Sequence, residues 1–198
     1  GYMATAINDF IQGIIMIFGI VAVIAAVLNS QGGFLAALEG LAQVSDPEVS
    51  AAPGVFASFF GPDPLNLLGV VVLTSLGTWG LPQMVQKFYA IKSEKAIDTG
   101  TVISTLFAVI GAGGCYFLGG FGRLFSDQID IAANGYDSVI PTMLSGLPDV
   151  LLAVVVVLVL SASMSTLSSL VLASSSTLTL DLLKDHVWKD MDQKRQVF

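Results

Sequence analysis

The stretch VLLAVVVVLVLSASMSTLSSLVLASSSTLTLDLL, residues 150–183, changes character after its eleventh residue. Residues 150–160 carry no polar side chain, whereas in residues 161–183 every second or third side chain carries a hydroxyl. About 20 apolar residues suffice for a helix to cross a bilayer, so the run over 149–180 predicts a transmembrane helix. Its hydroxyl-rich half predicts that part of this helix faces something other than lipid.

The rest of the chain has the composition of a membrane protein. Hydrophobic residues make up 54% of the 198 residues, charged residues make up 12%, and the mean hydropathy is +0.81. These values are typical of membrane proteins rather than soluble domains. We therefore predict an all-α integral membrane fold. Four transmembrane helices are expected, at about 9–29, at 64–88 with a break near 77–82, at 101–122 and at 149–180.

The basic residues are concentrated on one side of this path. Seven of the eight lie in or beside the connection 89–100 and the tail 184–198, namely Lys87, Lys92, Lys95, Lys184, Lys189, Lys194 and Arg195. The connections 30–63 and 123–148 contain a single basic residue, Arg123. By the positive-inside bias, 89–100 is an inner loop, 184–198 is an inner tail, and the other two are outer loops. Both ends of the chain would then be cytoplasmic.

The first outer connection is long for a membrane hairpin. It contains FLAALEGLAQV, residues 34–44, in which apolar residues recur at helical spacing. This pattern predicts a short helix lying on the outer surface.

The second apolar run is interrupted near its end. Gly77, Gly80 and Pro82 surround Thr78 and Trp79. Proline removes a backbone donor and glycine makes local unwinding easy, so a break in the helix is expected there. Broken membrane helices are a recurring way for transporters to hold substrates and ions. A simple proline kink in a structural helix is the alternative.

Asp9 lies at the inner end of the first run. A carboxylate at or inside the membrane boundary is costly and usually faces a partner or a water-filled path. If the helix begins just before Phe10, however, Asp9 would be only an interfacial N-cap.

The hydroxyl-rich half of the fourth run forms a stripe on a helix. Ala162, Thr166, Ser169 and Ala173 share one face, and Ser161, Ser165 and Ser168 line the adjacent face. Isolated hydroxyls in membrane helices usually bond back to a carbonyl or join neighbouring helices. An adjacent Ser–Thr pair and a carbonyl one turn earlier would instead present three oxygens beside the helix, and hard cations such as Na⁺ prefer oxygen ligands.

Three stretches resemble the sodium:solute symporter family, particularly its sodium/proline-type and related organic-solute members. They are TAINDFIQG at 5–13, GTWGLPQMVQKFYAIKSEKAI at 77–97 and SASMSTLSSLVLASSSTLTLDLL at 161–183. The resemblance implies a LeuT-like inverted-repeat fold, in which the four runs would be core helices five to eight. Residues 1–198 would then form a partial transmembrane transporter domain, an excerpt of a longer carrier that is unable to transport on its own.

The resemblance also implies cation sites. The main Na⁺ site of the family matches Ala162 through its carbonyl and Ser165 and Thr166 through their hydroxyls, with further ligands on core helix one. A second Na⁺ site, which some members use, matches the side chains Asp9, Ser168 and Ser169.

By the same resemblance, Thr78, Trp79 and Pro82 match positions that face the substrate. Several proline carriers have an aromatic residue where Thr78 stands and histidine where Gln83 stands. This departure argues against proline itself as the substrate.

The implied function is secondary active transport, in which inward Na⁺ movement drives uptake of a small organic solute such as proline or another amino acid. The expected partners are Na⁺, the solute, the lipid bilayer and the remaining helices of the full-length carrier, in the plasma membrane. No enzymatic activity and no nucleic-acid partner are expected. The alternative is a structural or pore-lining membrane subunit with no solute coupling.

Overall fold

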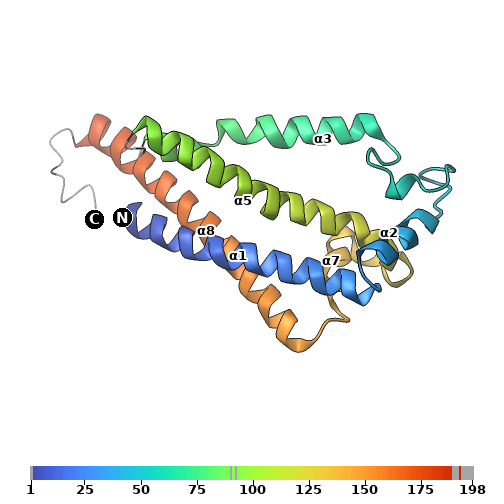
Figure 1. Ribbon diagram of the computed structural model, residues 1–198. Helices are drawn as coiled ribbons and strands as arrows, with labels where there is room; N and C mark the ends of the chain where they lie inside the picture. Colours follow the sequence, from blue (N-terminus) through green and yellow to red (C-terminus); the bar gives the residue numbers. More distant parts are fainter. Residues whose placement is uncertain (1, 90, 92, 189–191, 193–198) are drawn as a thin grey trace.

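The computed structural model describes residues 2–89, 91, 93–188 and 192. Three long helices dominate it, α1 (Tyr2–Ser30), α5 (Glu94–Gly120) and α8 (Asp149–Ser176) (Figure 1). Each is long and apolar enough to cross a membrane. The prediction of an all-helical fold suited to a membrane is therefore confirmed.

α5 and α8 both pack against α1. α1 and α5 run in one direction, while α8 runs in the other (Figure 1). As a result, α1 begins at the same end of the molecule at which the α8 segment ends. We call this the terminal end, and the opposite end the loop end. This alternation agrees with the expected topology, and the cytoplasmic location of the terminal end stays a prediction.

The segment expected to be the second span consists of three pieces. They are α3 (Pro64–Gly77), the 3₁₀ turn η2 (Thr78–Gly80) and α4 (Pro82–Tyr89). Leu81 between the last two has extended backbone angles, so the chain leaves the helix and re-enters it at a proline. At 1.5 Å per residue, α3 is only about 21 Å long, short of the roughly 30 Å of a bilayer core. A count of four spans therefore stays a prediction.

The two connections expected to be outer contain short helical elements gathered at the loop end. They are α2 (Phe34–Gln43), η1 (Val55–Ala57), η3 (Phe121–Gln128), α6 (Ile131–Asn134), η4 (Tyr136–Ser138) and α7 (Val139–Leu144). The helix expected over 34–44 is confirmed as α2. It does more than lie on the surface, because its Ala37 and Leu41 are buried.

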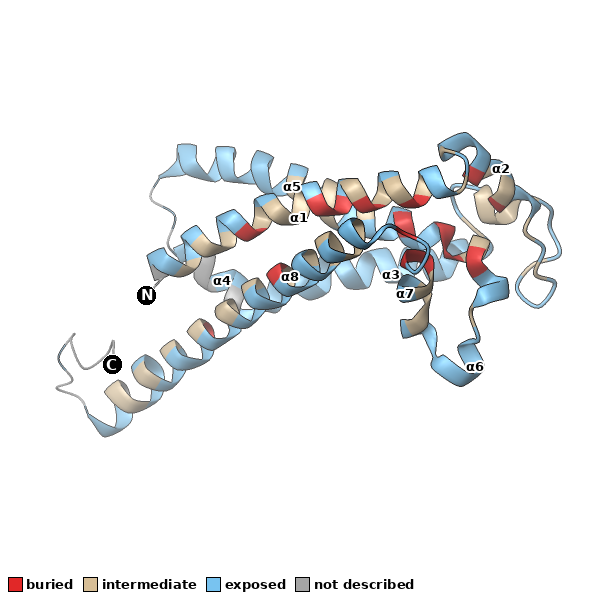
Figure 2. Ribbon diagram, turned by 90° about the horizontal axis from the view of Figure 1, so that it is seen from below, coloured by how far each residue is buried: buried red, intermediate tan, exposed pale blue. Residues whose placement is uncertain are grey.

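The hydrophobic core also lies at the loop end, where the buried residues cluster (Figure 2). It is formed where α1 and α5 end and α2, η3 and α7 pack between them. The buried core residues are Val23, Val27, Ala37, Leu41, Leu118, Phe121, Phe125, Met143, Leu144 and Leu147.

A charged contact holds the first outer connection to this core. The Arg123 guanidinium lies 2.8 Å from an Asp46 carboxylate oxygen and 4.1 Å from the centre of the Phe56 ring. Because the ion pair is partly exposed, it contributes at most about 1 kcal/mol. The contact fixes the position of the 46–56 loop more than it stabilises the fold.

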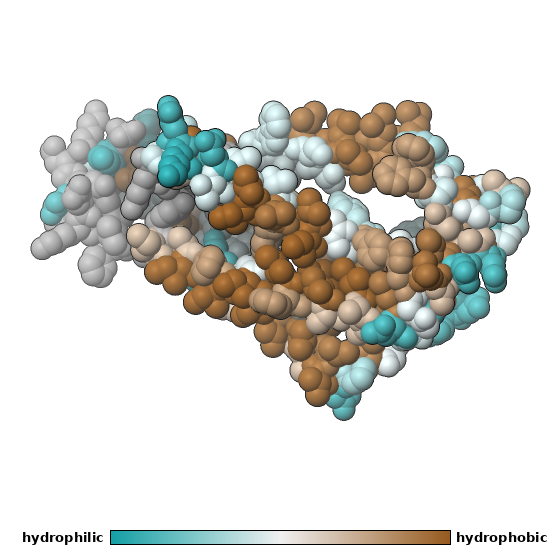
Figure 3. All heavy atoms as spheres, viewed as in Figure 1, coloured by the Kyte–Doolittle hydropathy of each residue, from teal (hydrophilic) through white to brown (hydrophobic). Residues whose placement is uncertain are grey.

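Away from the loop end, the sides of the long helices are apolar and exposed (Figure 3). None of the fourteen described residues of α3 is buried, and Figure 3 shows an open gap between α3 and the rest of the molecule. Exposed apolar area of this extent requires a lipid or protein cover. The fold is thus consistent with a bilayer environment.

The long helices extend beyond the apolar runs that predicted them. α1 begins at Tyr2 rather than near residue 9, and α5 begins at Glu94 rather than near 101. The hydroxyl of Ser93 caps α5 by accepting a hydrogen bond from the Ala96 amide at 3.3 Å. The polar cap and first turn of α5 belong to the helix but lower its hydropathy, so hydropathy alone places this start too late. In α1 the polar pair Asn8 and Asp9 interrupts the apolar pattern instead.

At the terminal end, α8 continues as the π-helix η5 (Thr177–Val187). Of the inner tail expected over 184–198, the structure describes only residues 184–188 and 192. Lys184 is among them. The tail residues Lys189, Lys194 and Arg195, and Lys92 of the expected inner loop, lie outside the described residues.

Candidate functional site

A hydrogen bond joins α1 to α8 inside the membrane-spanning region. The Ser165 hydroxyl donates to a carboxylate oxygen of Asp9, with 2.9 Å between Oγ and Oδ1. Both residues are half-buried between the two helices. The residues lie 156 positions apart in the sequence, so the packing of the helices alone brings them together.

The position of Asp9 excludes the capping role that the sequence left open. α1 begins at Tyr2, which places Asp9 in the interior of the helix rather than before its first turn. A carboxylate at this depth needs polar partners, because the bilayer supplies none. Ser165 is one such partner.

Thr166 and Ala162 form a second pair of oxygens on α8. The Thr166 hydroxyl donates to the Ala162 carbonyl, with 3.0 Å between the oxygens. This is the back-bonding that hydroxyls in helices commonly adopt. Thr166 is nevertheless exposed, and its hydroxyl oxygen keeps lone pairs that a cation can use. Ala162 and Thr166 line an open pocket of about 540 Å³, together with Ser163, Leu167 and Leu170.

The residues expected to form the main cation site therefore fall into two groups. Ala162 and Thr166 line the open pocket, whereas the hydroxyl of Ser165 is directed to Asp9 on α1. Residues 165 and 166 are adjacent on the helix and about 100° apart around it, so they present their hydroxyls to different neighbours.

Ser168 and Ser169 follow one turn closer to the terminal end, and both are half-buried. Ser168 lines a pocket of about 440 Å³ between α8 and the start of α1, where Ala4 and Thr5 form the other wall. The structure thus places Ser168 on the side of α8 that faces α1, the helix that carries Asp9.

The residues expected to face a substrate are only partly brought together. The Thr78 hydroxyl lies 3.3 Å from the Ser75 carbonyl, to which it donates, and the Trp79 side chain is 75% exposed. Pro82 lines a pocket of about 700 Å³ against α8 and η5, and neither Thr78 nor Trp79 is among the residues that line it.

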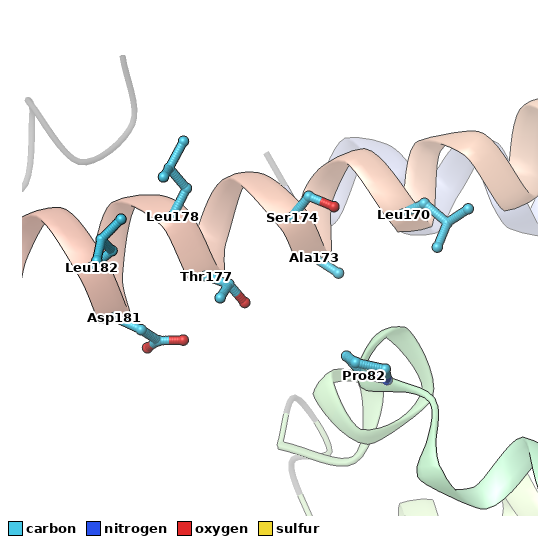
Figure 4. Close-up of a pocket in the computed structure, with 8 residues that line it drawn as sticks. All are labelled: Pro82, Leu170, Ala173, Ser174, Thr177, Leu178, Asp181 and Leu182. Atoms are coloured by element: carbon cyan, nitrogen blue, oxygen red, sulfur yellow. The ribbon is translucent and has the colours of Figure 1, made fainter.

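Sequence reasoning missed the α8 side of this pocket. Figure 4 shows Ala173, Thr177 and Asp181 pointing toward the side on which Pro82 lies. The remaining lining residues are Leu170, Ser174, Leu178 and Leu182. Helical spacing alone indicated that these side chains share a face, and only the structure shows that the face is turned to the break in the second apolar segment.

A further polar residue, Gln12, was also missed. Its side chain lies on α1 and is only 6% exposed. The oxygen Oε1 is buried and has no hydrogen-bond donor among the described residues. The signal in the sequence was the spacing, since Gln12 follows Asp9 by three positions and so lies on the same side of a helix.

The available ligand atoms are oxygens. Within the described part of the chain, no three His, Cys, Asp or Glu side chains come together in a way that could hold a metal ion. Hydroxyl, carbonyl and carboxylate oxygens suit hard cations such as Na⁺ rather than zinc or copper.

Comparisons with known proteins agree with this chemistry. The chain is similar to the sodium/pantothenate symporter of Haemophilus influenzae, at 28% identity over 187 residues, covering 92% of this chain and 36% of that protein. It is 30% identical over 182 residues to the sodium/pantothenate symporter of Escherichia coli, covering 92% of this chain and 36% of that protein. It is 27% identical over 205 residues to the sodium/proline symporter of Escherichia coli, covering all of this chain and 39% of that protein.

The chain therefore spans less than two fifths of the length of these relatives. No solved structure matches it significantly. The sequence profile of one family matches residues 1–198, the whole chain. The chain belongs to the sodium:solute symporter family.

Proposed function

We propose that the carrier containing this chain couples inward Na⁺ movement to the uptake of a small organic solute. The observation that carries the proposal is the oxygen pair of Ala162 and Thr166, 3.0 Å apart beside an open pocket in a chain of this family. Two adjacent oxygens form part of a coordination shell for Na⁺, and the remaining ligands would come from helices of the full-length carrier.

The proposed main Na⁺ site consists of the Ala162 carbonyl and the Ser165 and Thr166 hydroxyls. Its occupation requires Ser165 to offer lone pairs to the ion while its hydroxyl proton stays directed at the Asp9 carboxylate, and the 2.9 Å bond is compatible with this. A second Na⁺ site is proposed at Asp9, Ser168 and Ser169. The position of Ser168 on the side of α8 that faces α1 supports it for Ser168.

The proposed coupling follows from the energetics of the ion. Moving one Na⁺ inward down a membrane potential of 100 mV supplies about 2.3 kcal/mol, to which the concentration gradient adds. Na⁺ acts on the solute only if it binds one conformation better than the other. A site with ligands on α8 and on a second helix meets this requirement. When the two helices move relative to each other, the ligands separate and the site binds Na⁺ less well.

The proposed solute is a small organic molecule, with proline or another amino acid as the first class to test. Sodium/proline and sodium/pantothenate symporters are both among the relatives, and both solutes carry one carboxylate. Thr78, Trp79 and Pro82 are proposed to face the solute, and the pocket lined by Pro82 supports this for one of them.

The proposed setting is the plasma membrane, with four spans that correspond to core helices five to eight of a LeuT-like fold and with both chain ends cytoplasmic. The common position of the start of α1 and the end of η5 supports this topology. The exposed apolar sides of the helices would contact lipid and the remaining helices of the carrier.

The test is solute uptake by the full-length carrier in a transport-deficient host, with Na⁺ present or replaced by K⁺. The panel would contain amino acids, pantothenate, sugars and carboxylates. We expect at least one solute to accumulate only with Na⁺. If expression is confirmed and no solute responds to Na⁺, the proposal is wrong and a structural or pore-lining subunit becomes the better explanation.

Two variants of Thr166 test the site itself. Thr166→Ala removes one oxygen ligand and keeps helix propensity, so the Na⁺ concentration for half-maximal uptake should rise about tenfold or more. Thr166→Ser retains the hydroxyl and should stay within about threefold of the wild-type carrier. If Thr166→Ala is expressed normally and shows the same Na⁺ dependence as the wild-type carrier, Thr166 is not part of the site.

A further inference from the structure

Gln12 is a buried amide whose oxygen has no donor among the residues that the structure describes. The side chain is 6% exposed, and Oε1 has no hydrogen-bond partner within the described part of the chain. A buried polar atom without a partner is destabilising, whereas an apolar side chain of similar shape has no such cost. Native proteins rarely keep such a group unless it serves a ligand, an ion or an ordered water.

The helix register places Gln12 beside the polar contact between α1 and α8. Asp9 is bonded to Ser165, and a Cβ added to Gly19 would lie 2.7 Å from a methyl group of Leu158. These two contacts fix the register of the antiparallel helices. Gln12 lies between them on α1 and follows Asp9 by one turn.

The facing part of α8 is also polar at this level. Ser161 lies one turn before Ser165 on the same face and is only 7% exposed. The helical spacing therefore places Asp9 and Gln12 on neighbouring turns of α1, and Ser161 and Ser165 on neighbouring turns of α8, where the two helices pack. Neither helix contains a Lys, Arg or His, so neither brings a positive charge of its own to these oxygens.

We propose that the amide oxygen of Gln12 is a ligand of a Na⁺ ion bound between α1 and α8 beside Asp9 and Ser165. A cation satisfies a buried oxygen that has no donor, and it balances the carboxylate one turn away. This inference rests on the proposed function and uses Asp9 of the proposed second cation site. Gln12 lies on the loop-end side of Asp9, whereas Ser168 lies toward the terminal end, beside Ala4 and Thr5. It assigns Gln12 to ion binding rather than to helix packing.

The test measures the thermal midpoint of the purified full-length carrier in Na⁺ and in K⁺ at equal ionic strength, over a range of concentrations. Gln12→Met keeps the shape and removes the oxygen. We expect it to need on the order of tenfold more Na⁺ for the same increase in midpoint. Gln12→Glu keeps an oxygen at the same reach and should retain the Na⁺ response. Gln43→Met, on the exposed face of α2, is the matched control and should behave as the wild-type carrier.

The outcomes separate this inference from the proposed function. If Gln12→Met raises the midpoint equally in both salts and leaves the Na⁺ response unchanged, Gln12 is a packing residue or binds only water, and the inference fails alone. If Na⁺ has no effect on the wild-type midpoint and drives no uptake, the proposed function fails and this inference with it. A Na⁺ response that is weakened in Gln12→Met and kept in Gln12→Glu supports both.

Discussion

At the scale of single residues, Asp9 is the only acidic side chain within the α1 sequence, and it is bonded to α8. If it holds a second Na⁺, Asp9→Asn removes the charge that balances this ion and keeps the shape of the side chain. We expect uptake to continue with a less steep dependence on Na⁺ concentration and with fewer ions moved per solute. Parallel flux measurements of Na⁺ and solute in proteoliposomes measure this ratio.

Asp98→Asn is the matched control, because Asp98 is exposed near the start of α5. It should leave the ratio unchanged. An unchanged ratio in Asp9→Asn as well, at normal expression, would show that Asp9 has a structural role only.

The sequence could predict which residue types would matter here but not how they would pair. The hydroxyl density of α8 and the position of Asp9 both marked this region. The bond from Thr166 to Ala162 lies within one helix and follows from local spacing, whereas the bond from Ser165 to Asp9 depends on the register of two helices and joins residues 156 positions apart. Gln12 escaped notice because an amide in an apolar run resembles an ordinary packing residue until its burial is known.

At the scale of elements, the close approach of α1 and α8 depends on Gly19. A Cβ at this position would lie 2.7 Å from Leu158 Cδ1 and 3.3 Å from its Cγ, so a side chain as large as leucine overpacks this contact and displaces Leu158 or the helix that carries it. Gly19→Leu should destabilise the full-length carrier by about 1–3 kcal/mol, measured as a lower thermal midpoint.

Leu158→Ala supplies the control for this change. Combined with Gly19→Leu, it moves the large side chain to the other helix and should restore much of the midpoint. If the double variant loses stability as the simple sum of the two single variants, the contact between Gly19 and Leu158 is not what holds the helices together.

The sequence predicted helices well where hydropathy determines them, and less well where caps and breaks determine where a helix begins or ends. The long apolar runs gave α1, α5 and α8, and the helical spacing in 34–44 gave α2. The start of α5 came too late because its polar cap and first turn lower hydropathy, and the start of α1 came too late because Asn8 and Asp9 interrupt the apolar pattern. The 3₁₀ and short helical pieces between residues 121 and 144 have no strong sequence period, so packing at the loop end determines them.

At the scale of the whole molecule, the chain leaves much apolar surface uncovered, and the Na⁺ sites proposed for it would need further ligands from other helices of the carrier. We therefore expect that this chain, reconstituted alone in liposomes, shows no Na⁺-driven solute accumulation. The full-length carrier under the same gradient should accumulate solute. Accumulation by the chain alone would show that these helices suffice for coupling and would overturn this view of the site.

The uneven distribution of the core has a mechanical consequence. α8 is packed near its start through Leu151, Leu152 and Val155, and it diverges from α1 toward the terminal end (Figure 2). A helix of 28 residues is about 42 Å long, so a tilt of about 5° around the packed end displaces the far end by roughly 4 Å. In such a tilt the loop end would be the pivot and α8 the lever arm, and a small rearrangement in the core would be amplified where the pockets beside Ser168 and Pro82 lie.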